Sequence, residues 1–139
     1  MTKDIHTGGC VCGAIRYEVA GPIEQIIQCH CLDCQKATGT GASANISVLT
    51  DDFRLIRGAP KVFTQVVQSG RTAHRAFCGN CGSPIWSGRE NSPERTMLKA
   101  GTLDDSSSAR IVLNIWTSSA AHWMAWDRDL PSHENNRPV

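Results

Sequence analysis

Short apolar segments separated by turn residues make up most of the chain. Within these segments apolar and polar residues alternate or β-branched residues cluster, and both patterns are typical of β-strands. Gly, Pro, Asn, Asp and Ser fall between the segments and predict turns. We therefore expect a mainly-β protein with one or two short helices, over 33–38 and 118–123. The predicted strands cover 14–19, 25–29, 44–49, 53–57, 62–67, 72–77, 85–86, 96–100 and 111–116.

The length of 139 residues favours one domain. A chain of this size buries roughly 68–70% of the surface that it exposes when unfolded, which is enough for a hydrophobic core. No internal repeat or interdomain linker interrupts the pattern. The polar segment that begins at Ser132 is expected to be a mobile tail.

Charge and hydropathy disfavour two classes of partner. The 14 Lys and Arg residues nearly balance the 13 Asp and Glu residues, for a net charge of +1. A dedicated nucleic-acid binder usually carries a marked basic excess, so nucleic acid is an improbable partner. No apolar run is long enough to cross a bilayer, and the first residues lack the apolar stretch of a secretory signal. We expect a cytoplasmic protein that does not enter the membrane.

Seven cysteines in three groups are the distinctive feature of the composition. Their number is odd, so disulfides cannot pair all of them, and closely spaced cysteines in a reducing compartment are typical of metal sites. A thioredoxin-like redox pair would require a βαβ context, and the spacings of ferredoxin iron–sulfur sites are absent. Zinc is the expected metal. The groups are Cys10 with Cys12, Cys29 with Cys31 and Cys34, and Cys78 with Cys81.

The spacing suggests how these groups divide between metal ions. Structural zinc is usually bound by four ligands, often as two pairs that are distant in sequence, and the outer two groups meet that description. The central trio supplies three ligands and leaves a fourth position for water or substrate, as catalytic zinc sites do. Spacing alone would also allow the pairs to be exchanged between sites. His30 lies between two cysteines, but an extended backbone would point its ring to the opposite face, which favours a structural role.

Six ordered sequence blocks resemble the glutathione-dependent formaldehyde-activating enzyme (GFA) family, which also includes centromere protein V. They are spread over a match that covers roughly residues 7 to 131 and, taken together, are highly specific. The blocks are GCVCGAIRY at 9–17, CHCLDCQK at 29–36, FCGNCGSP at 77–84, KAGTLDD at 99–105, NIWTSS at 114–119 and WDRDLP at 126–131.

The resemblance implies a single zinc-binding domain with the fold described as a β-tent, over 7–131, with an N-terminal extension at 1–6 and a polar tail at 132–139. It implies a structural zinc at the outer cysteines and a second, labile zinc at the trio. The three cysteines of the trio would also be the catalytic residues. The structural ligands would be Cys10, Cys12, Cys78 and Cys81, and the active-site ligands Cys29, Cys31 and Cys34. The chain carries Asn114 where many relatives have His, and Gln35 where many have a basic residue.

Two functions follow as hypotheses. The first is a zinc-dependent enzyme of the carbon–sulfur lyase type that acts on a small thiol adduct, with glutathione or its aldehyde adduct as the implied partner. The second is a non-catalytic zinc module that carries a small thiol or mediates protein interaction. Candidate basic groups near the trio are Lys36, Arg71 and Arg75. The four tryptophans could line a pocket or pack in the core, and the sequence specifies neither the substrate nor the oligomeric state.

Overall fold

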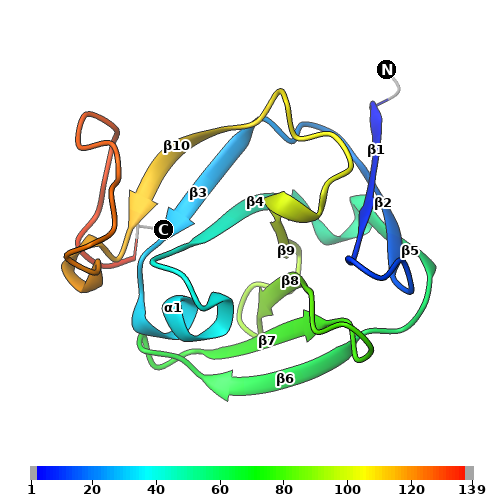
Figure 1. Ribbon diagram of the computed structural model, residues 1–139, viewed down its shortest axis with the longest axis horizontal. Helices are drawn as coiled ribbons and strands as arrows, with labels where there is room; N and C mark the ends of the chain where they lie inside the picture. The colour runs from blue at the N-terminus through cyan, green and yellow to red at the C-terminus, as the bar shows by residue number, and fades with distance from the viewer. Residues whose placement is uncertain (1–2, 137–139) are drawn as a thin grey trace.

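The computed structural model describes residues 3–136 as two β-sheets with one α-helix. The smaller sheet has the order β1-β2-β5 and is antiparallel throughout. Figure 1 shows it at one side of the molecule, apart from the long curved sheet that forms the rest of the fold. Its strands are β1 (Ile5–Gly9), β2 (Arg16–Ala20) and β5 (Phe53–Arg57).

The larger sheet has seven strands in the order β10-β3-β4-β9-β8-β7-β6. Neighbours are antiparallel, except that β10 runs parallel to β3. The strands are β3 (Gln25–Cys29), β4 (Ser43–Leu49), β6 (Lys61–Val66), β7 (Thr72–Phe77), β8 (Pro84–Arg89), β9 (Arg95–Lys99) and β10 (Arg110–Ile115). Helix α1 (Leu32–Thr38) follows β3 directly, and three 3-10 turns lie at η1 (Thr50–Asp52), η2 (Ala100–Thr102) and η3 (Thr117–Ser119).

Two hydrophobic clusters form the core. The main cluster lies between the sheets, where Tyr17 stacks on Phe53 with ring centroids 5.0 Å apart and Phe53 meets the edge-on ring of Trp86 at 5.0 Å. These contacts join strands of the smaller sheet to β8 of the larger sheet. The second cluster packs Ile27 and Ile115 against the cysteine trio. The trio is therefore built into a packed region rather than carried on a loose loop.

The mainly-β, single-domain prediction is confirmed. Strands at 25–29, 53–57 and 72–77 occur with the predicted bounds. The sequence missed β1, whose two glycines weaken the strand pattern. Gly8 lies so close to the Tyr17 hydroxyl and the Thr102 carbonyl that a Cβ atom would clash with both. The glycine is therefore required by close packing against β2, which its sequence context did not reveal.

Two predictions near the C-terminus were wrong. The helix expected at 118–123 is only the short turn η3, with Ala120 already extended beyond it. The segment from Ser132 packs along β10 instead of being mobile over its described length: Ser132 forms a parallel bridge to Asn114, and the Trp116 amide donates to the Asn135 carbonyl at 2.9 Å. Residues 137–139 of the expected tail and 1–2 of the expected extension lie outside the described part, and β1 begins inside that extension.

Among residues 3–136, no helix has both the length and the apolar character needed to span a bilayer.

Candidate functional site

The outer two cysteine pairs come together between two turns. Cys10 and Cys12 lie in the β1–β2 turn, and Cys78 and Cys81 lie in the β7–β8 turn, with all four sulfur atoms within 4.8 Å of one another. Cys10 and Cys12 are 3.6 Å apart at sulfur, and Cys12 and Cys78 are 3.8 Å apart. Tetrahedral zinc with Zn–S bonds of about 2.3 Å separates its sulfur ligands by roughly 3.8 Å. This donor set fits zinc, and the pairing of 10–12 with 78–81 is the one the sequence favoured.

Both turns direct hydrogen bonds at the sulfur atoms. The Ile15 amide donates to Cys10 Sγ at 3.2 Å, and the Asn80 side chain donates to Cys12 Sγ at 3.3 Å. Gly82 adopts a φ of 80° and closes the second turn through its amide, which donates to the Cys78 carbonyl at 2.8 Å. Such donors stabilise thiolates, the form that binds metal.

The electrostatics of Cys81 favour its thiolate. The Ser83 hydroxyl lies 3.1 Å from Cys81 Sγ and lowers the pKa of that thiol to about 5. Cys10 and Cys12 occupy the tight turn between β1 and β2, and this turn brings both sulfur atoms to the same point.

The central trio forms where β3 passes into α1. Cys29 ends the strand, Cys31 caps the helix and Cys34 lies in its first turn, where the Cys34 amide donates to Cys31 Sγ at 3.3 Å. The three sulfur atoms lie within 4.8 Å of one another and all three residues are buried. The helix N-terminus carries partial positive charge, which favours thiolate. Three soft donors grouped in this way fit a zinc ion.

Negative charge concentrates on Cys34. Hydrogen bonds from Cys29 and Cys31 lower the pKa of the Cys34 thiol to about 2, against the opposing effect of burial. The reciprocal contacts with Cys31 and Cys34, together with burial, raise the pKa of Cys29 above its ordinary value. Within the trio, these contacts therefore favour the thiolate at Cys34 over the thiolate at Cys29.

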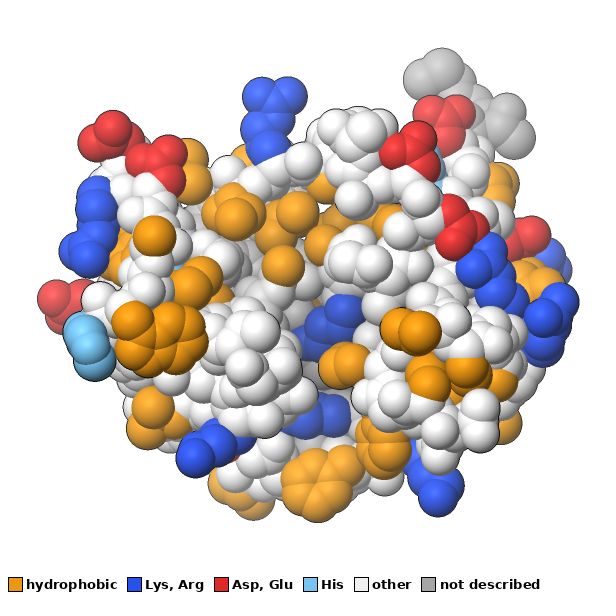
Figure 2. All heavy atoms as spheres, in the orientation of Figure 1, with side chains coloured by type: hydrophobic (Ala, Val, Ile, Leu, Met, Phe, Trp, Pro, Cys, Tyr) orange, Lys and Arg blue, Asp and Glu red, His pale blue; other side chains and the backbone are white. Residues whose placement is uncertain are grey.

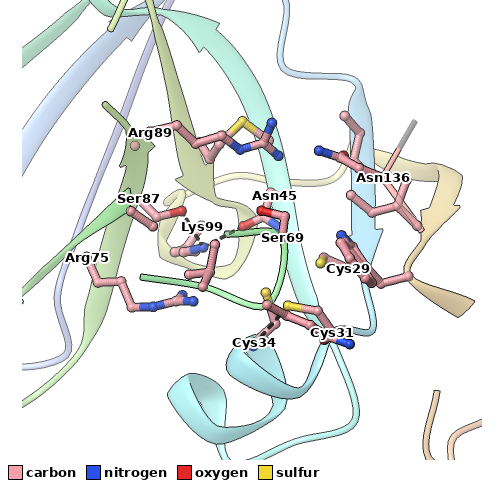
Figure 3. Close-up of a pocket in the computed structure, with 18 residues that line it drawn as sticks. Cys29, Cys31, Cys34, Asn45, Ser69, Arg75, Ser87, Arg89, Lys99 and Asn136 are labelled. Atoms are coloured by element: carbon pink, nitrogen blue, oxygen red, sulfur yellow. Dashed lines mark hydrogen bonds between the residues drawn. The ribbon is translucent and has the colours of Figure 1, made fainter. Parts of the chain in front are cut away.

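A pocket of about 80 Å³ opens beside the trio (Figure 3). Its floor is one face of the large sheet, because alternate residues of neighbouring strands point to the same side. Asn45 lies opposite Lys99 in the β4–β9 register, and Arg75 lies opposite Ser87 in the β7–β8 register. Further residues of this face that line the pocket are Ile27, Cys29, Ala73, Met97 and Arg89.

Lys99 is the polar residue at the centre of this floor. Its ammonium donates to Asn45 Oδ1 at 2.6 Å and to Ser87 Oγ at 3.1 Å. Desolvation lowers its pKa to about 8, while the charge of Cys34 acts in the opposite direction. An ammonium held this close to three cysteines can offset negative charge that develops on sulfur.

Four pocket residues had no role predicted from the sequence: Lys99, Asn45, Ser87 and Arg89. The sequence feature that could have revealed them was strand alternation, because Met97 and Lys99 in β9 share a face, as do Ser87 and Arg89 in β8. Alternation shows which residues share a face, but the strand order was needed to show that these faces meet at the trio.

The three basic candidates from the sequence are separated in space. Arg75 lines the pocket beside the trio, where its Nε donates to Gln65 Oε1 at 2.8 Å. Arg71 lines an adjoining pocket, and Lys36 lies on α1 beside another pocket together with Phe63. The structure thus brings one of the three to the trio.

His30 belongs to a buried polar contact behind the trio. Its Nε2 donates to Asn114 Oδ1 at 2.9 Å, and its ring lies 5.6 Å from Trp126. His30 joins neither cysteine group, in agreement with the structural role expected of it. Asn114, the residue singled out in the sequence, is the hydrogen-bond partner of that ring. Gln35 donates to the carbonyls of His30 and Ser119, both at 2.9 Å, and so connects α1 to the segment that follows β3 and to η3.

The four tryptophans have different environments. Trp116 lines the pocket of the trio, and Trp86 packs at the main core. Trp126 lies against His30, and the Arg128 guanidinium lies over the Trp126 ring, 4.1 Å from its centroid. Trp123 is exposed. Only Trp116 is placed to contact a ligand of the trio pocket.

Comparison with solved structures supports the fold. A crystal structure of a Rhodobacter sphaeroides protein superposes with a TM-score of 0.58 at 24% sequence identity, covering 70% of this chain and 87% of that one. At this level of identity the likeness concerns the fold alone.

Comparison with sequences identifies the family. A protein of Halomonas elongata, provisionally named a glutathione-dependent formaldehyde-activating enzyme, is 33% identical over 104 residues. The match covers 70% of this chain and 64% of the relative, so the chain spans less than two thirds of that relative's length. The family model described as glutathione-dependent formaldehyde-activating enzyme matches residues 5–119, a range that includes every cysteine of both groups. With both cysteine groups assembled inside that range, this chain belongs to the glutathione-dependent formaldehyde-activating enzyme family.

Proposed function

We propose that this protein is a zinc-dependent enzyme of the carbon–sulfur lyase type that acts on the adduct of a small thiol with an aldehyde. The observation that carries the proposal is the position of the trio: three sulfur atoms within 4.8 Å of one another line a pocket together with Lys99. Family membership makes a glutathione-like thiol the first candidate substrate. The cytoplasm, where such thiols are abundant and reduced, is the proposed location.

The two cysteine groups have different roles in this proposal. Cys10, Cys12, Cys78 and Cys81 hold a structural zinc, because four ligands complete a tetrahedron. Cys29, Cys31 and Cys34 hold a second, more labile zinc and form the reaction centre, because three ligands leave one position for the substrate sulfur.

The reaction is the reversible cleavage of an S-hydroxymethyl thiol. The carbon–sulfur bond breaks, its electron pair stays on sulfur, the hydroxyl loses its proton, and an aldehyde and a thiol result. When bound, Zn²⁺ supplies a Lewis acid that favours the thiolate form of a coordinating sulfur. Lys99 faces the same position and offsets the negative charge that collects on sulfur as the bond breaks. Asn45 and Ser87 hold the Lys99 ammonium in that orientation.

The test measures the rate of exchange between free thiol and its aldehyde adduct. NMR monitors this exchange in the presence of zinc-loaded protein, with a panel of thiols and small aldehydes. The wild-type protein should accelerate exchange above the spontaneous rate. Lys99→Met should reduce that acceleration about 100-fold, the usual cost of removing one donor that stabilises developing charge. Lys36→Met is the matched control, because it removes the same charge from α1 outside the trio pocket.

Two results would contradict the enzyme proposal. If Lys99→Met and Lys36→Met had equal effects, the pocket of the trio would not be the reaction centre. If wild-type protein bound thiols and accelerated no exchange across the panel, the chain would be a thiol carrier that uses the same site without turnover.

A further inference from the structure

A second pocket, of about 560 Å³, adjoins the pocket of the trio. The two share part of their lining, so a ligand with its sulfur at the trio can extend from one into the other. The shared residues include apolar side chains, which suit the carbon chain of a ligand. The full shared set is Ile27, Arg89, Met97, Ile115 and Asn136.

The charge of these two pockets is strongly one-sided. Five cationic side chains line them, and within residues 3–136 no Asp or Glu is among their lining residues. This contrasts with the chain as a whole, in which acidic and basic residues nearly balance. Figure 2 shows Lys and Arg side chains inside the hollow near the centre of the face it presents. The cations are Arg71, Arg75, Arg89, Arg95 and Lys99.

The cysteine trio accounts for only part of this positive charge. Three thiolates and one divalent cation carry a formal charge of −1, which the ammonium of Lys99 offsets. Within the described chain, the ion pairs involve other residues, and no carboxylate pairs with Arg71, Arg75 or Arg95. Uncompensated guanidinium groups around a pocket are a binding site for anionic groups, with carboxylate and phosphate as the best geometric matches.

The cationic side chains also lie at different distances from the trio along the sheet. Arg95 and Lys99 are four residues apart in β9 and lie at opposite ends of the strand. Four strand residues span roughly 13 Å. Met97 lies between them on the same face and faces both pockets. A ligand with its sulfur at the trio would thus place its distant end among the arginines.

We propose that the two pockets together select a thiol whose distant end is anionic and carries no ammonium group. The arginines Arg71 and Arg95 recognise the acidic groups, and the absence of a carboxylate from the described lining leaves an ammonium without an ionic partner. This inference rests on the proposed thiol site and narrows its substrate: an acidic thiol, rather than a zwitterionic or neutral one, is the preferred ligand.

Calorimetric titration of zinc-loaded protein at low ionic strength tests the inference with matched thiols. N-acetylglutathione keeps both carboxylates of glutathione and loses its ammonium, so it should bind about tenfold more tightly than glutathione, the effect of one charged interaction. Glutathione diethyl ester should bind about tenfold more weakly than glutathione or worse. Comparison of 4′-phosphopantetheine with pantetheine distinguishes phosphate from carboxylate as the preferred anion.

Variants assign the effect to residues. The double variant Arg71→Gln/Arg95→Gln should weaken N-acetylglutathione binding about 100-fold and reduce the salt dependence of its Kd, while leaving the affinity for pantetheine unchanged. Arg110→Gln is the control, because Arg110 lines neither pocket. It should alter none of these affinities.

The outcomes separate this inference from the proposed function beneath it. Equal affinity for acidic and neutral thiols, or a double variant that weakens both alike, would overturn charge selection and leave thiol binding at the trio intact. Failure of every thiol to bind the zinc-loaded protein would overturn both. Tighter binding of glutathione than of N-acetylglutathione would show that the ammonium is recognised, and would also overturn the inference.

Discussion

The two cysteine groups use the same ligand chemistry in opposite structural settings. The four-cysteine group joins turns from different sheets, with Cys12 and Cys78 separated by 66 residues in the chain. The trio comes from one short segment where β3 meets α1. A metal ion at the first group would close a long loop and connect the sheets, whereas an ion at the second would add little to chain connectivity.

The four-cysteine group and the trio also differ in burial and in the residues around them. Cys10 and Cys78 belong to the main core, while Cys12 and Cys81 are exposed at the surface. None of these four lines the trio pocket. The trio is wholly buried in protein except where it faces that pocket, and Lys99 lies across from it. The number of ligands and the nature of the neighbouring space, more than the ligand type, distinguish the proposed structural site from the proposed reaction centre.

The largest expected effect is on folding. Cys81→Ala removes one of four ligands from the group that links the sheets, and structural zinc contributes roughly 10–16 kcal/mol in small zinc peptides. We expect most soluble protein, or the cooperative thermal transition, to be lost. Circular dichroism melts and soluble yield measure this. A well-folded Cys81→Ala variant with an unchanged melt would show that Cys81 is not a ligand of the structural site.

The next effect concerns the number of bound ions. Cys34→Ser replaces a soft thiolate by a hard hydroxyl, so the trio should lose its zinc while the four-cysteine group keeps its own. Metal analysis should give about two equivalents for wild-type protein, one of which mild chelation removes, and one resistant equivalent for the variant. The variant should keep its cooperative melt. Two tightly bound equivalents in Cys34→Ser would show that the trio does not hold the labile ion.

A smaller effect is expected behind the trio. Asn114→Ala leaves the buried His30 Nε2 without its acceptor, which should cost about 1–3 kcal/mol in the free energy of unfolding. His30 lies between Cys29 and Cys31, two of the proposed ligands, so the zinc affinity of the trio should fall about tenfold, as happens when groups that orient ligands are removed. Denaturant unfolding and competitive chelation measure the two effects. Equal loss of affinity at both metal sites would indicate general destabilisation instead.

The smallest effect at neutral pH is expected at the main core. The Tyr17 hydroxyl lies 2.8 Å from Thr102 Oγ1, and Tyr17→Phe should cost about 1 kcal/mol by removing that hydrogen bond. Burial raises the pKa of Tyr17 to about 12 from its ordinary value of 10.0.

The raised pKa of Tyr17 also predicts a pH dependence. The folded state keeps the phenolic proton that the unfolded state releases between pH 10 and 12, so stability from this group is complete below pH 10 and is lost as pH rises through that window. Each pKa unit corresponds to about 1.4 kcal/mol. The free energy of unfolding of the wild-type protein should therefore fall more steeply from pH 9.5 to 11 than that of Tyr17→Phe. Parallel pH profiles for the two proteins would contradict this assignment.

Much of the fold followed from local pattern. Strands β3, β5 and β7 match their predicted bounds, because each has a short apolar or alternating run closed by turn residues. The helix expected at 118–123 failed because the backbone turns away after η3, and the downstream segment instead exchanges hydrogen bonds with the end of β10 and with η3. Tertiary pairing overrode a weak local preference there. The glycines of β1 were misleading for the same reason, since Gly8 is selected by the proximity of Tyr17.

The grouping of the cysteines was accessible from the sequence, and the chemistry of their surroundings was not. The odd number and the spacing favoured metal ligation and a four-plus-three division but left an exchange of the pairs open, and the family resemblance selected the grouping, because ligand geometry is short-ranged and strict. The placement of Lys99, Asn45 and Ser87 beside the trio depends on strand order and register, which bring together residues from β4, β8 and β9. Those long-range pairings leave no trace in any one segment, so only the tertiary structure decided which charges face the cysteine trio.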